Sequence, residues 1–354
     1  MATTAIFTGA GASKAIGYPL TREFLPRVRS ELECGVLFAE TNTPESDKRR
    51  RDELGRMLHT LLPGFARVPD ADLPLITDVF SLVEYAIAAG EALPIGDDHA
   101  LRRCRDLLKH AITDVLIGDF LEPWDSDNAD HRRQEDVLER LVAWIQKLGS
   151  DGAMISTNYD IGVEYELFRR VGRSEVVNGV DLGFDWRDTR TGAERTRPPL
   201  ATMRIYELHG SLDVLKCSAC GYVYFNPWGQ IAFRAFKDEL DINNTCVCSD
   251  DVKLQLHIVA PSIIREVRDA SLLSVWRSAL EWLRNADEWY IIGYSLPPED
   301  LAIRSLLIRA FAGRRKKPEV TVVQHGDADR TRYELLFPGC TYYPDGLAAF
   351  LGTA

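Results

Sequence analysis

The sequence has no apolar stretch long enough to cross a lipid bilayer, so we expect no membrane-spanning helix. Its first residues also lack the basic and apolar regions of a secretory signal peptide, and strand-like residues begin almost at Met1. No internal repeat and no low-complexity segment is visible. We therefore expect a cytoplasmic protein that does not associate with a membrane.

Positive charge is scarce: 42 Lys and Arg residues face 53 Asp and Glu residues, a formal net charge of −11. Nucleic-acid binding needs clustered Lys and Arg, so we expect no direct contact with DNA or RNA. The basic runs at residues 48–51 and 314–317 are interpreted as solvated surface. Seven cysteines do not suggest a disulfide framework in a cytosolic chain of 354 residues.

Short apolar runs alternate with helical patterns along most of the chain. This alternation predicts an α/β fold, a Rossmann-like parallel sheet with helices on both faces. The strands are predicted at residues 5–8, 152–157, 203–208, 257–261, 289–292 and 320–323.

Two segments interrupt this pattern. Residues 27–150 carry apolar residues at helical spacing and are predicted to form a large helical insertion. Residues 212–256 contain clustered cysteines and are predicted to form a small zinc-ribbon-like module, after a loop or hairpin at 185–199. The core domain is then predicted to comprise residues 1–26, 151–211 and 257–354.

The first predicted strand runs into alternating glycines and small residues: Gly9, Ala10, Gly11 and, after one alanine, Ser13. Glycines there let the backbone turn sharply and approach a ligand, and the N–H groups that open the next helix favour an anion. The same pattern also arises from close strand–helix packing. We predict a phosphate-binding loop, with close packing as the alternative.

Polar side chains follow two other predicted strands. Asn158 comes after the strand at 152–157, and His209 comes after the strand at 203–208. The carboxyl ends of parallel strands meet at one edge of a sheet, where such folds bind ligands. We therefore predict that Asn158 and His209 share one site with the glycine loop.

Four of the cysteines have metal-ligand spacing: Cys217, Cys220, Cys246 and Cys248. The Cys-x-x-Cys pair is a strong ligand pattern, and the Cys-x-Cys pair is less usual but can chelate. We predict one closed, structural zinc site. The alternative is a module that has lost its metal and is held together by its aromatic residues.

In this order, the motifs resemble those of the Sir2 (sirtuin) family. A Gly-Ala-Gly-x-Ser loop, a Thr-Gln-Asn-x-Asp motif, a His-Gly motif, a four-cysteine module and a Gly-Thr-Ser-type loop each have a counterpart. The chain looks closer to bacterial Sir2-like antiphage defence proteins, which consume NAD, than to protein deacetylases. The resemblance implies that Asn158 positions the nicotinamide ribose and that His209 is the general base, a role that suits the pKa of histidine.

The resemblance also implies which residues contact NAD. Asp160 matches the family's aspartate, either as a nicotinamide contact or as a helix cap, and Gln324 is either an adenosine contact or part of a surface turn. The full implied set is Gly9, Ala10, Gly11, Ser13, Arg22, Thr157, Asp160, Gly293, Ser295 and Gln324.

Three departures from the family favour water as the nucleophile. Thr21 replaces a phenylalanine thought to shield the sugar, Thr157 replaces the motif glutamine, and residues 261–266 lack the peptide-pairing stretch of deacetylases. The expected reaction is hydrolysis of NAD to nicotinamide and ADP-ribose. The alternatives are a protein-lysine deacylase and a non-catalytic scaffold that binds NAD or ADP-ribose, although a scaffold has no need of a general base.

Uncontrolled NAD hydrolysis would kill the host cell, so the resemblance implies a restrained antiphage effector. We expect control by homo-oligomerisation or by a partner such as a HerA-like ATPase or an Argonaute-type protein. The helical insertion is the expected contact surface.

Overall fold

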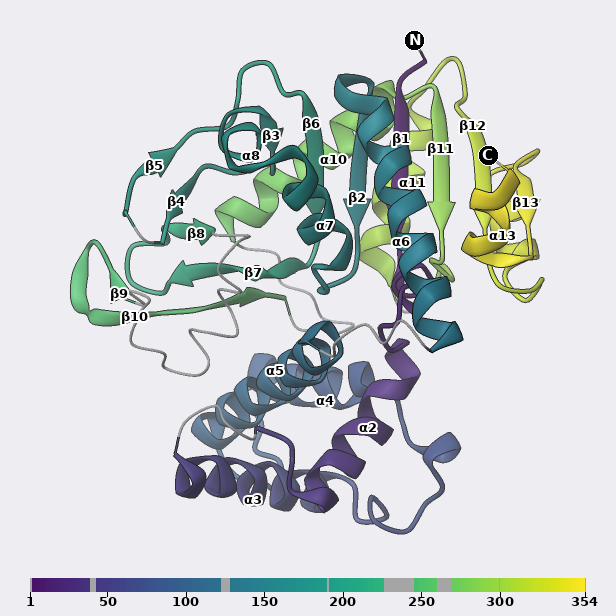
Figure 1. The fold of residues 1–354 in the computed structure, drawn as a ribbon. Helices are drawn as coiled ribbons and strands as arrows, with labels where there is room; N and C mark the ends of the chain where they lie inside the picture. The colour runs from purple at the N-terminus through teal and green to yellow at the C-terminus, as the bar shows by residue number, and fades with distance from the viewer. Residues whose placement is uncertain are drawn as a thin grey trace.

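The computed structural model describes residues 2–38, 43–121, 128–189, 191–225, 245–259, 269–298 and 300–353. Three parts are visible in Figure 1: a parallel sheet covered by helices, a second sheet beside it, and a lobe of helices below the first sheet. In the described part of the chain, no helix is long and apolar enough to span a membrane. Residues 261–266, where the sequence lacks the peptide-pairing stretch of deacetylases, lie outside the described ranges.

The parallel sheet has seven strands in the order β13-β12-β11-β1-β2-β6-β3. Their bounds are β1 Thr4–Thr8, β2 Gly152–Ser156, β3 Val180–Asp181, β6 Met203–Glu207, β11 Glu288–Ile292, β12 Glu319–Val323 and β13 Thr341–Tyr343. The helices that accompany it are α1 Ala10–Lys14, α6 Ala129–Leu148, α7 Gly162–Val171, α8 Arg173–Gly179, α10 Ala270–Asn285, α11 Leu301–Ala312, α12 Arg330–Leu336 and α13 Gly346–Thr353.

Each central strand is buried on both faces, as expected of a sheet between two helical layers. In β1, Ala5 and Phe7 pack on the side of α10 and α11, whereas Ile6 packs on the side of α6 and α7. Successive side chains of a strand point to opposite faces, so one five-residue strand contributes to both cores. The predicted Rossmann-like α/β class, with helices on both faces, is confirmed.

The strand order reverses at β1. From β1 the chain builds β2 and β6 on one side, and later β11, β12 and β13 on the other. All described pairings within this sheet are parallel. Such a reversal leaves a crevice outside the carboxyl ends of the strands, and this is where open α/β sheets bind ligands.

The second sheet is larger than the predicted cysteine module. Its order is β5-β4-β8-β7-β10-β9, with bounds β4 Trp186–Asp188, β5 Glu194–Arg195, β7 Gly210–Cys217, β8 Val223–Phe225, β9 Thr245–Cys246 and β10 Ser249–Ile258. The predicted loop or hairpin at 185–199 is the hairpin of β4 and β5. The predicted core strand at 257–261 is wrong for its described part. His257 and Ile258 continue the long strand β10, which pairs with β7, and Ile258 lies opposite Gly210.

Four helices form the lobe below the sheet: α2 Thr21–Cys34, α3 Pro44–Leu61, α4 Ile76–Ala89 and α5 Asp98–Leu121. The remaining helix of the range 27–150, α6, lies instead along the sheet and packs against β2, α7 and α13. The described residues also form two short 3-10 helices, Asp70–Asp72 and Gly149–Asp151.

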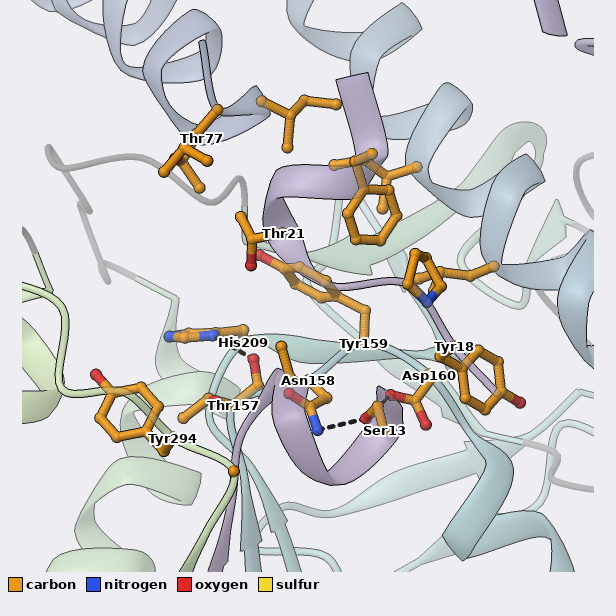
Figure 2. Close-up of a pocket in the computed structure, with 18 of the residues that line it drawn as sticks. Ser13, Tyr18, Thr21, Thr77, Thr157, Asn158, Tyr159, Asp160, His209 and Tyr294 are labelled. Atoms are coloured by element: carbon orange, nitrogen blue, oxygen red, sulfur yellow. Dashed lines mark hydrogen bonds between the residues drawn. The ribbon is translucent and has the colours of Figure 1, made fainter. Parts of the chain in front are cut away.

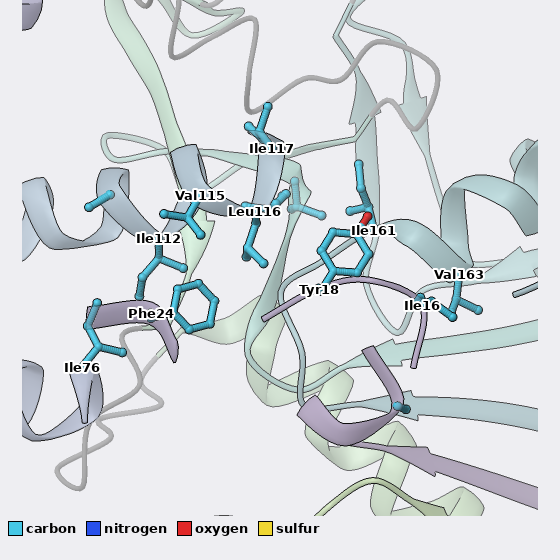
Figure 3. Close-up of a cluster of buried hydrophobic side chains, with 14 of the residues drawn as sticks. Ile16, Tyr18, Phe24, Ile76, Ile112, Val115, Leu116, Ile117, Ile161 and Val163 are labelled. Atoms are coloured by element: carbon cyan, nitrogen blue, oxygen red, sulfur yellow. The ribbon is translucent and has the colours of Figure 1, made fainter. Parts of the chain in front are cut away.

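An apolar cluster joins the lobe to the sheet (Figure 3). Phe24 of α2, Ile76 of α4 and Ile112 of α5 belong to the same buried cluster as Tyr18 and Ile161, which lie next to the sheet. Because this core is continuous, the lobe is held over the carboxyl edge of the sheet rather than hanging from a linker.

The loops after β1 and β11 touch through their backbones. The Gly9 N–H donates to the Ile292 carbonyl at 3.0 Å, and the Gly11 N–H donates to the Gly293 carbonyl at 2.8 Å. A Cβ on Gly9 would lie 2.7 Å from Tyr294 Cα, and a Cβ on Gly11 would lie 2.8 Å from Gly293 Cα. Close packing, the alternative left open by the sequence, therefore accounts for both glycines, and their N–H groups are engaged within the fold.

Replacing Gly293 tests this contact. Its φ is +63°, and an added Cβ would lie 2.1 Å from the Ala12 nitrogen. We expect Gly293→Ala to lower the free energy of unfolding by about 2–5 kcal/mol. The left-handed backbone conformation costs a residue with a Cβ about 1–2 kcal/mol, and overpacking adds about 1–3 kcal/mol. The measurement is urea unfolding. The control is Gly55→Ala in α3, where no atom lies within 4 Å of the added Cβ and a gain of about 0.5–1 kcal/mol is expected. An unchanged midpoint for Gly293→Ala would contradict the analysis.

Candidate functional site

A cavity of about 230 Å³ lies between the carboxyl edge of the parallel sheet and the helical lobe. Its floor comes from the loops after β1, β2, β6 and β11, which meet where the strand order reverses (Figure 2). Eight of the predicted site residues line it: Ala10, Ser13, Thr157, Asn158, Asp160, His209, Gly293 and Ser295. The topology thus gathers residues that lie up to 285 positions apart in the sequence, from Ala10 to Ser295.

The amide of Asn158 is held in one orientation. Its Nδ2 donates to the Gly9 carbonyl at 3.1 Å and to the Ser13 hydroxyl at 2.7 Å. A carbonyl oxygen can only accept, so the nitrogen of the amide must face Gly9. With both N–H groups engaged, the oxygen Oδ1 is the atom that Asn158 can offer to a ligand in the cavity.

Ser13 links this amide to a buried carboxyl. Its hydroxyl accepts from Asn158 and donates to Asp160 Oδ2 at 2.5 Å. Burial raises the pKa of Asp160 to about 6, although the hydrogen bonds from Ser13 and from the Gly162 N–H oppose the rise. In its ionised form Asp160 can only accept a hydrogen bond from the Ser13 hydroxyl, so the serine oxygen keeps its lone pairs for the Asn158 amide.

His209 lines the same cavity as Asn158. Its Nδ1 lies 2.8 Å from the Thr157 carbonyl. Since that oxygen can only accept, Nδ1 carries the proton in the neutral ring and Nε2 carries the lone pair. The Trp276 indole donates to the Leu208 carbonyl at 2.8 Å, and the Val259 N–H donates to the His209 carbonyl at 2.8 Å. These bonds fix the backbone on both sides of the ring.

Sequence reasoning missed the aromatic ring of Tyr159. The ring stands in the cavity beside Thr21 and above Asn158 (Figure 2), and its hydroxyl donates to the Val259 carbonyl at 2.7 Å. Tyr159 occupies the variable position of the Asn-x-Asp motif. The sequence shows that this residue is aromatic, but not that its ring points into the cavity. Sequence reasoning also missed the apolar roof that the lobe supplies, namely Phe24, Leu75, Ile76, Ile112 and Leu116.

Four predicted cofactor residues do not line the cavity. Gly9 and Gly11 support the backbone contact described above. Arg22 is exposed at the start of α2. Gln324 is buried, and its amide donates to the Tyr294 carbonyl, which also accepts from the Tyr333 hydroxyl. Gln324 thus holds the loop that carries Gly293 and Ser295, instead of facing a ligand in this cavity.

The four predicted metal ligands come together at the end of the second sheet. The sulfurs of Cys217, Cys220, Cys246 and Cys248 all lie within 4.8 Å of one another. Two of the separations, Cys217–Cys248 and Cys220–Cys246, are 3.7 and 3.4 Å. Tetrahedral zinc with bonds of about 2.3 Å requires sulfurs about 3.8 Å apart, so the cluster fits the ion.

Two further observations suit a thiolate site. Burial opposes ionisation of Cys217, but hydrogen bonds from the backbone N–H groups of Cys220 and Ala219 and from the neighbouring cysteine side chains together lower the pKa of Cys217 to about 6. The Tyr224 hydroxyl lies 3.2 Å from the Cys246 sulfur. Four sulfur ligands would leave no open position, so the metal would be structural.

We expect one zinc per chain in protein purified without chelators. Cys220→Ser should lower the zinc content and expose the second sheet to proteolysis, while the parallel sheet keeps its unfolding midpoint. Cys34→Ser, which removes an exposed cysteine outside the cluster, should retain the zinc. Elemental analysis and limited proteolysis provide the readouts, and a zinc-free wild-type chain with a protease-resistant second sheet would contradict the assignment.

No protein-family model matches the chain, and no curated protein matches it. Solved structures of Sir2 proteins do match. One holds a p53 peptide and NAD⁺ (14% identity, 99% of this chain and 91% of that chain, TM-score 0.43). Another is bound to a propionylated peptide (12% identity, 99% of this chain and 91% of that chain, TM-score 0.41). A third holds an inhibitor, 2′-O-acetyl-ADP-ribose and a deacetylated p53 peptide (14% identity, 99% of this chain and 91% of that chain, TM-score 0.40). The chain is similar to these Sir2 proteins over nearly its whole length, at low sequence identity.

Proposed function

We propose that the chain is a Sir2-type enzyme that hydrolyses NAD to nicotinamide and ADP-ribose. The observation that carries this proposal is the convergence of Asn158 and His209 on one cavity at the point where the strand order reverses. One residue offers a fixed carbonyl oxygen, and the other offers a ring nitrogen able to take a proton.

The cavity volume suits part of the dinucleotide. At about 230 Å³ it is below the roughly 300–1,000 Å³ of sites that enclose a whole drug-sized ligand. We assign it to the nicotinamide and its ribose. The apolar roof suits the pyridinium ring, and the polar floor suits the ribose hydroxyls.

The chemistry follows from charge. The bond between ribose C1′ and the pyridinium nitrogen breaks, and both of its electrons leave with nicotinamide. The sugar becomes oxocarbenium-like, and the oriented Asn158 carbonyl with the ionised Asp160 behind Ser13 stabilises this positive charge. The oxygen of one water then bonds to C1′, and His209 Nε2 takes the proton that the water loses.

One observation favours a second candidate, a protein-lysine deacylase. The ring of Tyr159 stands in the cavity, where an aromatic side chain can keep water from the sugar. Thr21, which favours water, lines the same cavity. The two candidates differ in product, because a deacylase transfers the acyl group to ADP-ribose and a hydrolase releases free ADP-ribose.

We further propose that the enzyme acts in antiphage defence and is restrained by assembly or by a partner. The candidate partners are a second copy of the chain, a HerA-like ATPase or an Argonaute-type protein. The lobe covers the cavity, and its apolar core is continuous with that of the parallel sheet. A partner bound to the lobe could therefore alter access to the site. NAD loss in phage-infected cells, with and without the neighbouring genes, tests this role.

Asn158→Ala and His209→Ala should each abolish most NAD cleavage while the fold is kept. Loss of a general base commonly costs about 10²–10⁴-fold in rate. Nicotinamide release is measured by chromatography, and circular dichroism checks folding. His99→Ala, an exposed histidine in the first turn of α5, is the control and should match the wild type. Full turnover in either folded site variant would remove that residue from the mechanism.

Thr21→Phe should slow hydrolysis and leave NAD affinity nearly unchanged, because an aromatic side chain at this wall hinders water. The comparison is made across a titration of acetylated peptide, with Thr60→Phe on the exposed face of α3 as the control. The wild type should release ADP-ribose without peptide. Nicotinamide that appears only with peptide, together with O-acetyl-ADP-ribose, would replace the hydrolase with the deacylase.

A further inference from the structure

Four carboxyl groups gather beneath the floor of the cavity. Asp160 precedes α7, Glu164 lies in its first turn, Glu207 ends β6, and Asp213 lies in β7. Asp160, Glu164 and Asp213 are 6%, 3% and 3% exposed. Burial above all raises the pKa of Asp160 and of Asp213 to about 6, and it raises the pKa of both glutamates well above the usual value.

Little positive charge faces this group. Besides burial, the main influences on these pKa values are the other carboxyls, two serines and backbone N–H groups. Among the residues that the structure describes, no lysine or arginine is one of those influences. Buried carboxylates without a counter-charge are strongly unfavourable, so something must offset them.

A small internal cavity opens beside two of the carboxyls. Its volume is about 10 Å³, which is room for about one water-sized sphere. Its polar lining comes from Thr8, Ser13, Ser156, Asn158, Asp160 and Glu164, and its apolar lining from Ala12, Leu141, Met154 and Val163.

Two polar atoms of this lining are buried and unpaired. The hydroxyl of Thr8, a residue that is 2% exposed, and Oε1 of Glu164 accept no hydrogen bond from a donor within the described ranges. Oε1 of Glu207, whose carboxyl contacts that of Glu164, is unpaired in the same way. Thr8 ends β1 and Glu164 lies in α7, so two separate elements present an unpaired oxygen to the same small space. This observation is independent of the carboxyl charges and points to an occupant of the cavity.

Three kinds of occupant are physically distinct. Protons on the carboxyls would reduce the charge, but they would leave the Thr8 hydroxyl unpaired. A water molecule would pair both oxygens, but the charge would then have to be removed by protons shared among the carboxyls. A cation does both, and a lining of carboxylate and hydroxyl oxygens suits a hard alkali or alkaline-earth ion.

We propose that this cavity binds one hard metal cation through Asp160, Glu164 and Thr8. The ion also lies next to Glu207, whose carboxyl contacts that of Glu164. By keeping Asp160 ionised, it keeps the Ser13 hydroxyl donating to Asp160, and so preserves the orientation of Asn158. The three ligands lie beneath the floor of the site, so binding of the ion does not depend on which reaction takes place in the larger cavity.

Thermal unfolding of the full-length protein tests the proposal. The protein is exchanged into choline chloride at pH 7.5 without a chelator, so that the cysteine site is untouched, and its zinc content is checked. Sodium, potassium, magnesium and calcium chlorides are then titrated at constant ionic strength. At least one cation should raise the unfolding midpoint saturably, with a stoichiometry of one per chain.

Matched variants locate the ion. Thr8→Val removes a hydroxyl without changing the shape of the side chain, and Glu164→Gln removes a charge. In either variant, no cation should raise the unfolding midpoint above its value in choline chloride. Glu91→Gln, which replaces an exposed glutamate, should keep the cation-dependent rise. If Glu164→Gln does not fold, Thr8→Val decides.

Two results would overturn the proposal. A wild-type midpoint that no cation raises above choline would assign the cavity to water and shared protons. A rise that persists in Thr8→Val and in Glu164→Gln would place the ion elsewhere. Neither result bears on NAD hydrolysis, so failure of this proposal is distinguishable from failure of the proposed function.

Discussion

The backbone contact between the loops after β1 and β11 is the constraint on which the site depends. Gly9 and Gly11 pack against Gly293 at distances that no side chain permits. This contact joins two loops at the carboxyl edge of the sheet where its strand order reverses, and it places the Gly9 carbonyl where it can accept a hydrogen bond from Asn158. The packing of the fold and the orientation of a site residue therefore rest on the same few backbone atoms.

From this contact a chain of hydrogen bonds runs through the floor of the site. Gly9 and Ser13 together orient the Asn158 amide, and Asp160 in turn orients Ser13. Thr157 fixes the tautomer of His209 from the neighbouring strand. A polar floor of this kind is pre-organised, which is the property that catalysis of a charged transition state requires. The helical lobe adds an apolar roof that shares its core with the sheet.

Much of the fold could be predicted because its strands are short, apolar and separated by helical patterns. The strands near 5–8, 152–157, 203–208, 289–292 and 320–323 are confirmed. The strand predicted at 257–261 is wrong in its described part, because an apolar run does not reveal whether it pairs with β7 or with the parallel sheet.

The gathering of Asn158 and His209 could be predicted because each follows a strand end, whereas Asp160 was suggested only by the family resemblance. The roof, the direction of Tyr159, the inward turn of Gln324 and the four-carboxyl group could not, since they depend on packing between segments far apart in the sequence. The most direct test of the whole account is a crystal structure of the His209→Ala chain with NAD bound. We predict the nicotinamide ribose in the cavity, within hydrogen-bonding distance of Asn158 Oδ1. A ribose bound elsewhere, or an Asn158 amide that turns its nitrogen to the ligand, would contradict it.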